Sequence, residues 1–153
     1  QVTAGKESTR NDSASAVLLA NAEYAKQQGW EILAYVEDYC TSGVEPERVM
    51  SAPIPAVKML LERNQLDVLD VDIYEHNEAF ASASCAVAQE LNIPEDRFNL
   101  HGGAVSLGHP LGSSGTRCLI TLLGVMRRCE ANSGIVTLCL GGGNAVAMLI
   151  RRS

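Results

Sequence analysis

The sequence has no apolar run long enough to cross a membrane and no excess of positive charge. Charged or polar residues interrupt every apolar stretch well before the roughly 20 residues that a transmembrane helix needs. Twelve Lys and Arg residues stand against 18 Asp and Glu, which gives a formal net charge of −6 at pH 7. This balance argues against a general nucleic-acid-binding protein. We therefore expect neither a membrane nor a nucleic acid as a partner.

The sequence also lacks CxxC pairs, and its five cysteines are odd in number. Both features disfavour a disulfide scaffold and a structural zinc site. We expect no metal and a reducing compartment: the cytoplasm, or the mitochondrion or peroxisome in a eukaryote. The GxGxxG, Walker A and HExxH motifs are absent too, so hydride transfer from nucleotides, phosphoryl transfer and zinc proteolysis lose support. Because the chain begins at Gln1, we expect a piece of a longer chain or a processed product.

The apolar pattern predicts one α/β domain. Short apolar or β-branched runs indicate strands at 14–20, 30–39, 71–74, 99–105, 135–140 and 145–150. Helical spacing indicates helices at 23–28, 53–64, 79–91 and 114–128. We expect Ser113 or Ser114 to cap the last helix. The last two strands form a predicted hairpin and are almost wholly apolar, which indicates helices on both faces of the sheet.

Two glycine-rich segments each hold one reactive side chain at the end of an apolar run. His109 lies between Gly108 and Pro110, and Cys139 precedes three glycines. An imidazole and a thiol can exchange protons with each other or with a substrate near neutral pH. The glycines can also leave backbone N–H groups free for an oxyanion hole. The alternatives are a histidine bonded to the backbone and a cysteine that packs as a small apolar residue.

Asn77 lies where a predicted strand meets a predicted helix. It either caps that helix, with Glu78 in the first turn, or holds a water or a substrate carbonyl through its amide. Like His109 and Cys139, it lies at the end of a predicted strand, and ligands of open α/β sheets bind at strand ends. We expect the adjacent His76 to fill a strand position.

Three segments in register resemble the carboxy-terminal signatures of the thiolase family. They are NEAFA at 77–81, GGAVSLGHPLGSSGTR at 102–117 and CLGGGNAVA at 139–147, and VTAGKESTRND at 2–12 resembles the family's VTAGNASxxND segment. The resemblance covers essentially the whole chain. It implies a thiolase-like half-domain of the α/β class, with a mixed, mainly five-stranded sheet and helices on both faces. Residues 1–29 would hold the end of the loop domain and the last strand and helix of the N-terminal half, and residues 30–153 the C-terminal domain.

The resemblance implies an acyl-CoA C-acyltransferase of fatty acid metabolism, which reversibly condenses acyl-CoA or thiolyses 3-ketoacyl-CoA. CoA and acyl-CoA are its substrates, and no cofactor is implied. The implied site residues are His109, Cys139, Asn77 and Gly141 for catalysis, and Ser8 and Phe80 for substrate binding.

Each implied catalytic residue has a chemical role. His109 would take the proton of a nucleophilic cysteine, and Cys139, as a thiol tuned toward thiolate, would exchange a proton with the α-carbon. Asn77, through a water, and His109 would bind the enolate oxygen, while the N–H of Gly141 would serve a second oxyanion hole. Ser8 would touch the pantetheine arm of CoA, and Phe80 would shape the pocket.

None of the five cysteines matches the family's nucleophile, which lies in the N-terminal half. We therefore expect the chain to be inactive alone, to need that missing half, and to associate into homo-oligomers through exposed apolar surface. One alternative is a non-catalytic thiolase-like module that binds acyl-CoA or acts in assembly. Another is a relative of the β-ketoacyl synthases, which Cys139 disfavours because those enzymes lack CxGGG.

Overall fold

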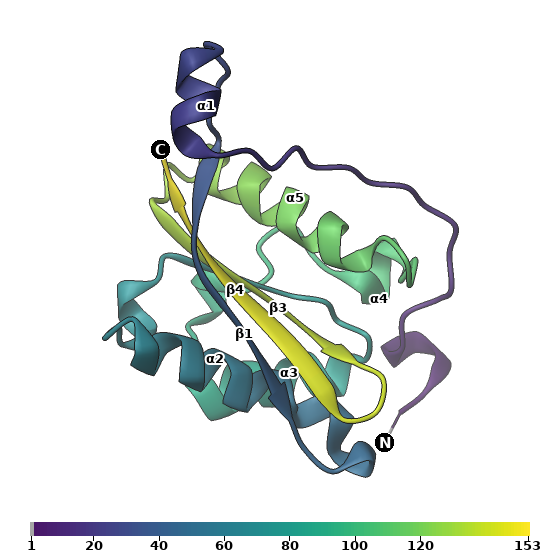
Figure 1. The fold of residues 1–153 in the computed structure, drawn as a ribbon. Helices are drawn as coiled ribbons and strands as arrows, with labels where there is room; N and C mark the ends of the chain where they lie inside the picture. The colour runs from purple at the N-terminus through teal and green to yellow at the C-terminus, as the bar shows by residue number, and fades with distance from the viewer. Residues whose placement is uncertain (1) are drawn as a thin grey trace.

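A mixed sheet of four strands organises the molecule (Figure 1). The computed structural model describes residues 2–153. The strands are β1 (Ala34–Gly43), β2 (Ile73–His76), β3 (Ser133–Leu140) and β4 (Asn144–Arg152). Their spatial order is β1-β4-β3-β2, with β2 parallel to β3 and the other pairs antiparallel. β3 and β4 form the predicted hairpin, so the centre of the sheet is the apolar pair of strands.

Helices cover both faces of this sheet. The α-helices are α1 (Ala22–Gln27), α2 (Pro53–Arg63), α3 (Ala81–Leu91), α4 (Ala104–Leu107) and α5 (Ser114–Arg128). Four short 3₁₀ helices join them: η1 (Ala4–Lys6), η2 (Pro46–Ser51), η3 (Val68–Asp70) and η4 (Glu95–Arg97). α2 packs on β1, β3 and β4 and against α3, while α5 packs on β2 and β3. Figure 1 shows α5 and α2 on opposite sides of the strands.

Alternate residues of the central strands pack into two separate hydrophobic cores. On β3, Ile135 belongs to the core under α2 and α3, whereas Val136 belongs to the core under α5. Leu149 and Ile150 divide in the same way on β4. Successive side chains of a strand point to opposite faces, so an apolar strand serves both layers. The predicted α/β class and the helices on both faces are confirmed.

The sheet has four strands and not five, because residues 99–105 do not form the predicted strand. Asn99 and Gly102 have positive φ angles of 49° and 76°, which turn the chain out of the extended conformation. The segment then enters α4. What remains of a fifth strand is one parallel bridge between Tyr74 and Phe98.

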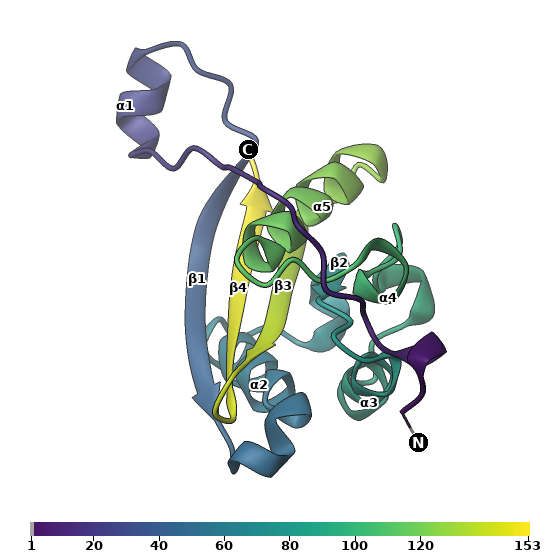
Figure 2. The same cartoon turned by 90° about the vertical axis from the view of Figure 1, so that its right-hand side faces the viewer.

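The predicted strand at 14–20 is likewise not formed within the described residues. This segment runs extended past α5 to α1, which stands away from the sheet in both ribbon views (Figures 1 and 2). Val17, Leu18 and Leu19 are 38%, 78% and 71% exposed. A strand needs a neighbour for its backbone hydrogen bonds, and no part of residues 2–153 supplies one here.

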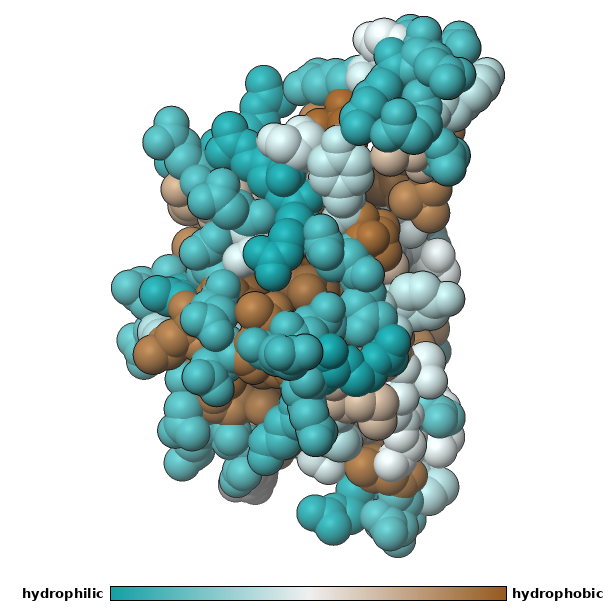
Figure 3. Space-filling view, turned by 60° about the vertical axis from the view of Figure 1, so that its left-hand side comes forward, coloured by the Kyte–Doolittle hydropathy of each residue, from teal (hydrophilic) through white to brown (hydrophobic). Residues whose placement is uncertain are grey.

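Apolar side chains reach the surface elsewhere too. Figure 3 shows brown apolar patches between hydrophilic groups on the face turned to the viewer. Among residues 2–153, no helix combines the length and the hydropathy that crossing a bilayer requires.

Leu122 on α5 allows a test of the second core. It is fully buried, so Leu122→Ala should lower the free energy of unfolding by about 2–5 kcal/mol through lost contacts and a cavity. Ile120→Ala on the same helix is the control, because Ile120 is 42% exposed and should cost less than about 1 kcal/mol. Denaturant unfolding measures both, and equal losses would contradict the assignment of α5 to this core.

Candidate active site

Asn77 is the first residue after β2, and the parallel pairing with β3 fixes its place. His76 pairs with Thr137, and the backbone N–H of Asn77 donates to the Thr137 carbonyl at 3.2 Å. The side chain of Asn77 is buried, with 1% of the residue exposed. α3 begins only at Ala81, with Phe80 at its N-cap position and no side-chain cap. The helix-cap interpretation of Asn77 is therefore wrong, and its amide is directed elsewhere.

The loop before His109 packs tightly on the residue that follows Asn77. The Glu78 carboxylate accepts hydrogen bonds from Asn99 Nδ2 at 3.1 Å and from the Val105 N–H at 3.4 Å. A Cβ at Gly103 would collide with the Glu78 side chain, so glycine is needed for this close approach. Glu78 thereby fastens the loop to the end of β2.

Gly108 and the N-terminal segment position His109. Gly108 has a φ of 92°, and a Cβ there would collide with the Asn11 side chain, so both conformation and space require glycine. The His109 N–H donates to the Thr9 carbonyl at 2.8 Å. Thr9 and Asn11, far away in the sequence, thus fix the backbone that carries the His109 side chain.

Ser114 engages one of the two ring nitrogens of His109. The Ser114 hydroxyl donates to the Pro110 carbonyl at 3.0 Å, and its oxygen lies 2.6 Å from His109 Nδ1. Nδ1 is thus engaged by Ser114 within the chain, and no described residue hydrogen-bonds Nε2. Nε2 is therefore the ring nitrogen free to act as a base. Burial, and next the positive charge of Arg117, lower the pKa of His109, so the ring is neutral near pH 7.

Asn77 and His109 meet at the end of β2. Asn77 Nδ2 lies 3.3 Å from His109 Nδ1, longer than the Ser114 contact. The other end of the amide, Oδ1, accepts from Arg117 Nη2 at 2.9 Å and from the Cys118 thiol at 3.7 Å. The structure therefore brings together two of the residues singled out from the sequence.

The contacts of Ser114 and Arg117 were not predicted. Ser113 is the N-cap residue of α5 but makes no capping hydrogen bond, and its hydroxyl pairs with Ser15 at 2.6 Å. Ser114 bonds to Pro110 and His109 instead of capping the helix. The apolar periodicity of the sequence does not predict these contacts, because they depend on how the turn after His109 leads into α5.

Cys139 lies at the same end of the sheet. It is two residues beyond Thr137 on β3, and its Sγ is 4.0 Å from Met50 Sδ on η2. Burial raises the pKa of the Cys139 thiol, and a backbone hydrogen bond offsets this in part. The expected tuning toward thiolate is thus not supplied by residues 2–153. The protonated thiol is the resting form in this chain.

The three remaining predicted residues lie close to these elements. The backbone N–H and the hydroxyl of Ser8 both donate to the Ala79 carbonyl, at 3.1 and 3.0 Å, and Glu7 forms a bridge with Phe80. Since its proton is used, the Ser8 hydroxyl can only accept from a ligand. Gly141 lies in the exposed turn between β3 and β4, with open space at its Cβ position.

A depression of about 430 Å³ opens beside His109, between residues 10–13 and 109–112. Asn77 and Cys139 do not line it, so this depression does not hold all three side chains. Among residues 2–153, no three His, Cys, Asp or Glu side chains are grouped to hold a metal ion.

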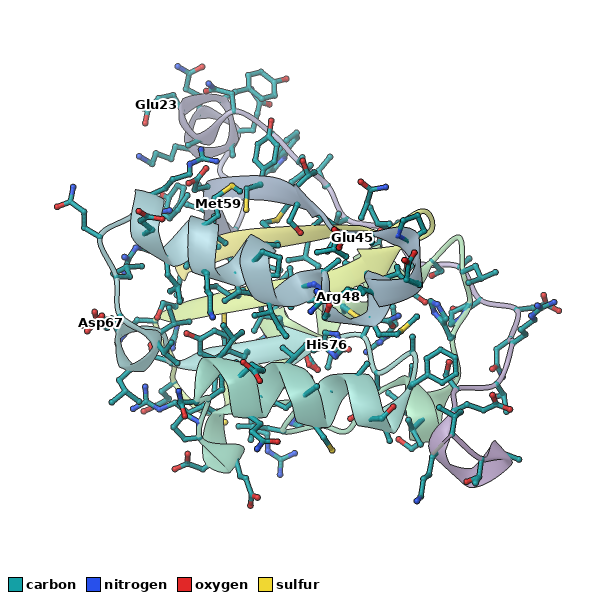
Figure 4. All side chains as sticks on the ribbon, turned by 90° about the horizontal axis from the view of Figure 1, so that it is seen from below. Glu23, Glu45, Arg48, Met59, Asp67 and His76 are labelled. Atoms are coloured by element: carbon teal, nitrogen blue, oxygen red, sulfur yellow. The ribbon has the colours of Figure 1, made fainter. Side chains whose placement is uncertain are left out.

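His76 fills the predicted strand position and plays a structural role. Its Nδ1 lies 2.7 Å from Ser84 Oγ on α3, and its ring stacks on Phe98 with centroids 6.2 Å apart. Burial lowers the pKa of His76 to about 4. Figure 4 shows it inside the molecule, whereas Glu23 on α1 stands apart from the main body.

Similarity to known proteins agrees with this geometry. The family model for the C-terminal domain of thiolase matches residues 30–152. An acetyl-CoA acetyltransferase of Chromobacterium violaceum is 45% identical over 151 residues, which are 99% of this chain and 38% of that relative. The chain thus spans well under half the length of such relatives.

Solved structures give the same result. The crystal structure of human mitochondrial 3-ketoacyl-CoA thiolase matches with a TM-score of 0.96 at 36% identity, covering 99% of this chain and 38% of that one. A structure of the human mitochondrial 3-ketoacyl-CoA thiolase in complex with CoA matches with a TM-score of 0.95 at 36% identity, and the match covers 99% of this chain and 39% of that one. Sequence and fold agree on the family: the chain belongs to the thiolases and contains their C-terminal domain.

Proposed function

We propose that this chain supplies the acid–base and oxyanion-binding half of an acyl-CoA C-acyltransferase, which condenses acyl-CoA or thiolyses 3-ketoacyl-CoA. The convergence of Asn77 and His109 at the end of β2, with Cys139 on the adjacent strand, carries the proposal. The acetyl-CoA acetyltransferase relatives and the CoA complex of the human enzyme support it. CoA and acyl-CoA are the substrates.

In thiolysis, the first step belongs to His109. Its Nε2 takes the proton of a nucleophilic cysteine thiol, which a part of the protein outside this chain provides. The sulfur attacks the 3-keto carbonyl, and the bond between C2 and C3 breaks. The electron pair of that bond passes to the departing acetyl-CoA enolate, and the acyl group remains on the nucleophile.

Asn77 and Cys139 act on the departing enolate. The Asn77 amide, through a water, and His109 bind the thioester oxygen while it carries negative charge, and each oriented donor contributes roughly 3–4 kcal/mol. The Cys139 thiol gives its proton to C2, which completes acetyl-CoA. A thiol held protonated by burial suits this acid role.

In the second half, the Cys139 thiolate takes the proton of the incoming CoA thiol, and the CoA sulfur attacks the acyl-enzyme carbonyl. The bond between the acyl group and the nucleophilic cysteine breaks, His109 returns its proton to that cysteine, and the shortened acyl-CoA leaves.

The same proposal assigns residues 1–29 and residues 30–153 to different domains of the whole protein. Residues 30–153 are the C-terminal domain, and residues 1–29 complete a loop domain and an N-terminal half that lie outside this sequence. The unpaired segment at 14–20 supports this assignment, because its exposed Leu18 and Leu19 need a sheet to pack on. We also propose that the whole protein is a cytoplasmic homo-oligomer.

The isolated 153-residue chain should show no turnover, because none of its cysteines is the acyl-accepting nucleophile. Thiolysis of acetoacetyl-CoA, followed as loss of substrate absorbance, measures this. The full-length protein is the positive control. Detectable turnover by the purified chain would disprove the division of labour between the two halves.

In the full-length protein, His109→Ala and Cys139→Ala should each lower kcat by about 10²–10⁴, the usual contribution of a positioned acid or base. Matched controls are His101→Ala and Cys129→Ala, since both residues are exposed and should leave kcat unchanged. Near-normal kcat in either site variant would refute its assigned role.

A further inference from the structure

Arg117 reaches from the first turns of α5 to the end of β2. Its Nη2 donates to Asn77 Oδ1 at 2.9 Å, forty positions away in the sequence. The Cys118 thiol donates to the same oxygen at 3.7 Å. Two consecutive residues of α5 therefore present donors to one end of a buried amide.

This arrangement decides the orientation of the Asn77 amide. A guanidinium has only donors, so the amide atom that faces Arg117 must be the oxygen. A rotated amide would set its NH₂ group against both Arg117 and Cys118 and leave buried donors without acceptors. Nδ2 is thereby directed to the side of His109, where the proposed oxyanion water is held.

Arg117 forms no salt bridge within residues 2–153. Burial raises the pKa of the buried Glu75 to about 8, with the charge of Arg117 acting in the opposite direction. Glu75 is therefore mostly protonated at pH 7. No described residue hydrogen-bonds the Glu75 carboxyl oxygens or the buried Nε and Nη1 of Arg117.

We propose that Arg117 is a positioning residue, which fixes the Asn77 amide for the oxyanion hole and places a positive charge beside His109. Its effect on turnover rests on the function proposed above. The geometric part is independent of turnover, because it concerns the state of Asn77 and His109 in the resting protein.

The charge of Arg117 shifts the pKa of His109 in a direction that can be tested. After burial, the charge of Arg117 is the second cause that lowers the pKa of His109. Loss of that charge should raise the pKa of His109, so more imidazole is protonated at a given pH. The acid limb of kcat/KM then moves to higher pH.

The test compares Arg117→Met, Arg117→Lys and Arg128→Met in the full-length protein. Arg128 is exposed at the far end of α5, so Arg128→Met removes the same charge away from the site.

Arg117→Met should lower kcat about tenfold or more, the effect of losing a charge-assisted hydrogen bond, and raise the pKa of His109. Arg117→Lys keeps the positive charge but loses the planar guanidinium with its fixed donor geometry. We therefore expect kcat to fall while His109 titrates as in the wild type. Arg128→Met should change neither property.

Histidine NMR titration reads the pKa of His109 without any turnover. If the wild-type protein shows no thiolysis, the proposed function fails, and the titration of Arg117→Met against Arg128→Met still decides whether Arg117 places its charge beside His109. Unchanged titration and kcat in Arg117→Met would overturn the inference. Should Arg117→Met not fold, wild-type kcat in Arg117→Lys would overturn it.

Discussion

The parallel pairing of β2 with β3 is the constraint on which the site depends. It bonds the Asn77 N–H to the Thr137 carbonyl and leaves Asn77 and Cys139 at one end of the sheet. Parallel strands must be joined by a crossover, and here the connection from β2 to β3 contains α3, the loop to His109, and α5. Three of the catalytic candidates are therefore products of one topological unit: the strand ends supply Asn77 and Cys139, and the crossover supplies His109.

Burial has the same physical effect on both proton-transferring groups. It lowers the pKa of the His109 imidazole and raises the pKa of the Cys139 thiol, because a low-dielectric surrounding disfavours either charged form. The result is a neutral base and a neutral acid in one region. This combination suits a reaction in which protons move in both directions.

Arg117 and Ser114 connect the helix to that chemistry. Both lie in the first turns of α5, where Ser114 orients the His109 ring and Arg117 orients the Asn77 amide. The apolar face of α5 packs into the second core, and Leu122 and Val125 hold the helix against β2 and β3. Core packing and site geometry are thus two consequences of the same helix docking.

The sequence by itself determined the α/β class, the β3–β4 hairpin, the positions of the main helices and the candidate residues His109, Cys139 and Asn77. These follow from local periodicity, glycine spacing and short motifs. Only the tertiary structure decided that residues 14–20 and 99–105 are not strands, because a strand exists only where a neighbour accepts its hydrogen bonds. It also decided which nitrogen of His109 is free, the orientation of Asn77 and the protonated state of Cys139. Those depend on burial and on tertiary contacts, some with partners forty or more positions away, which no local pattern records.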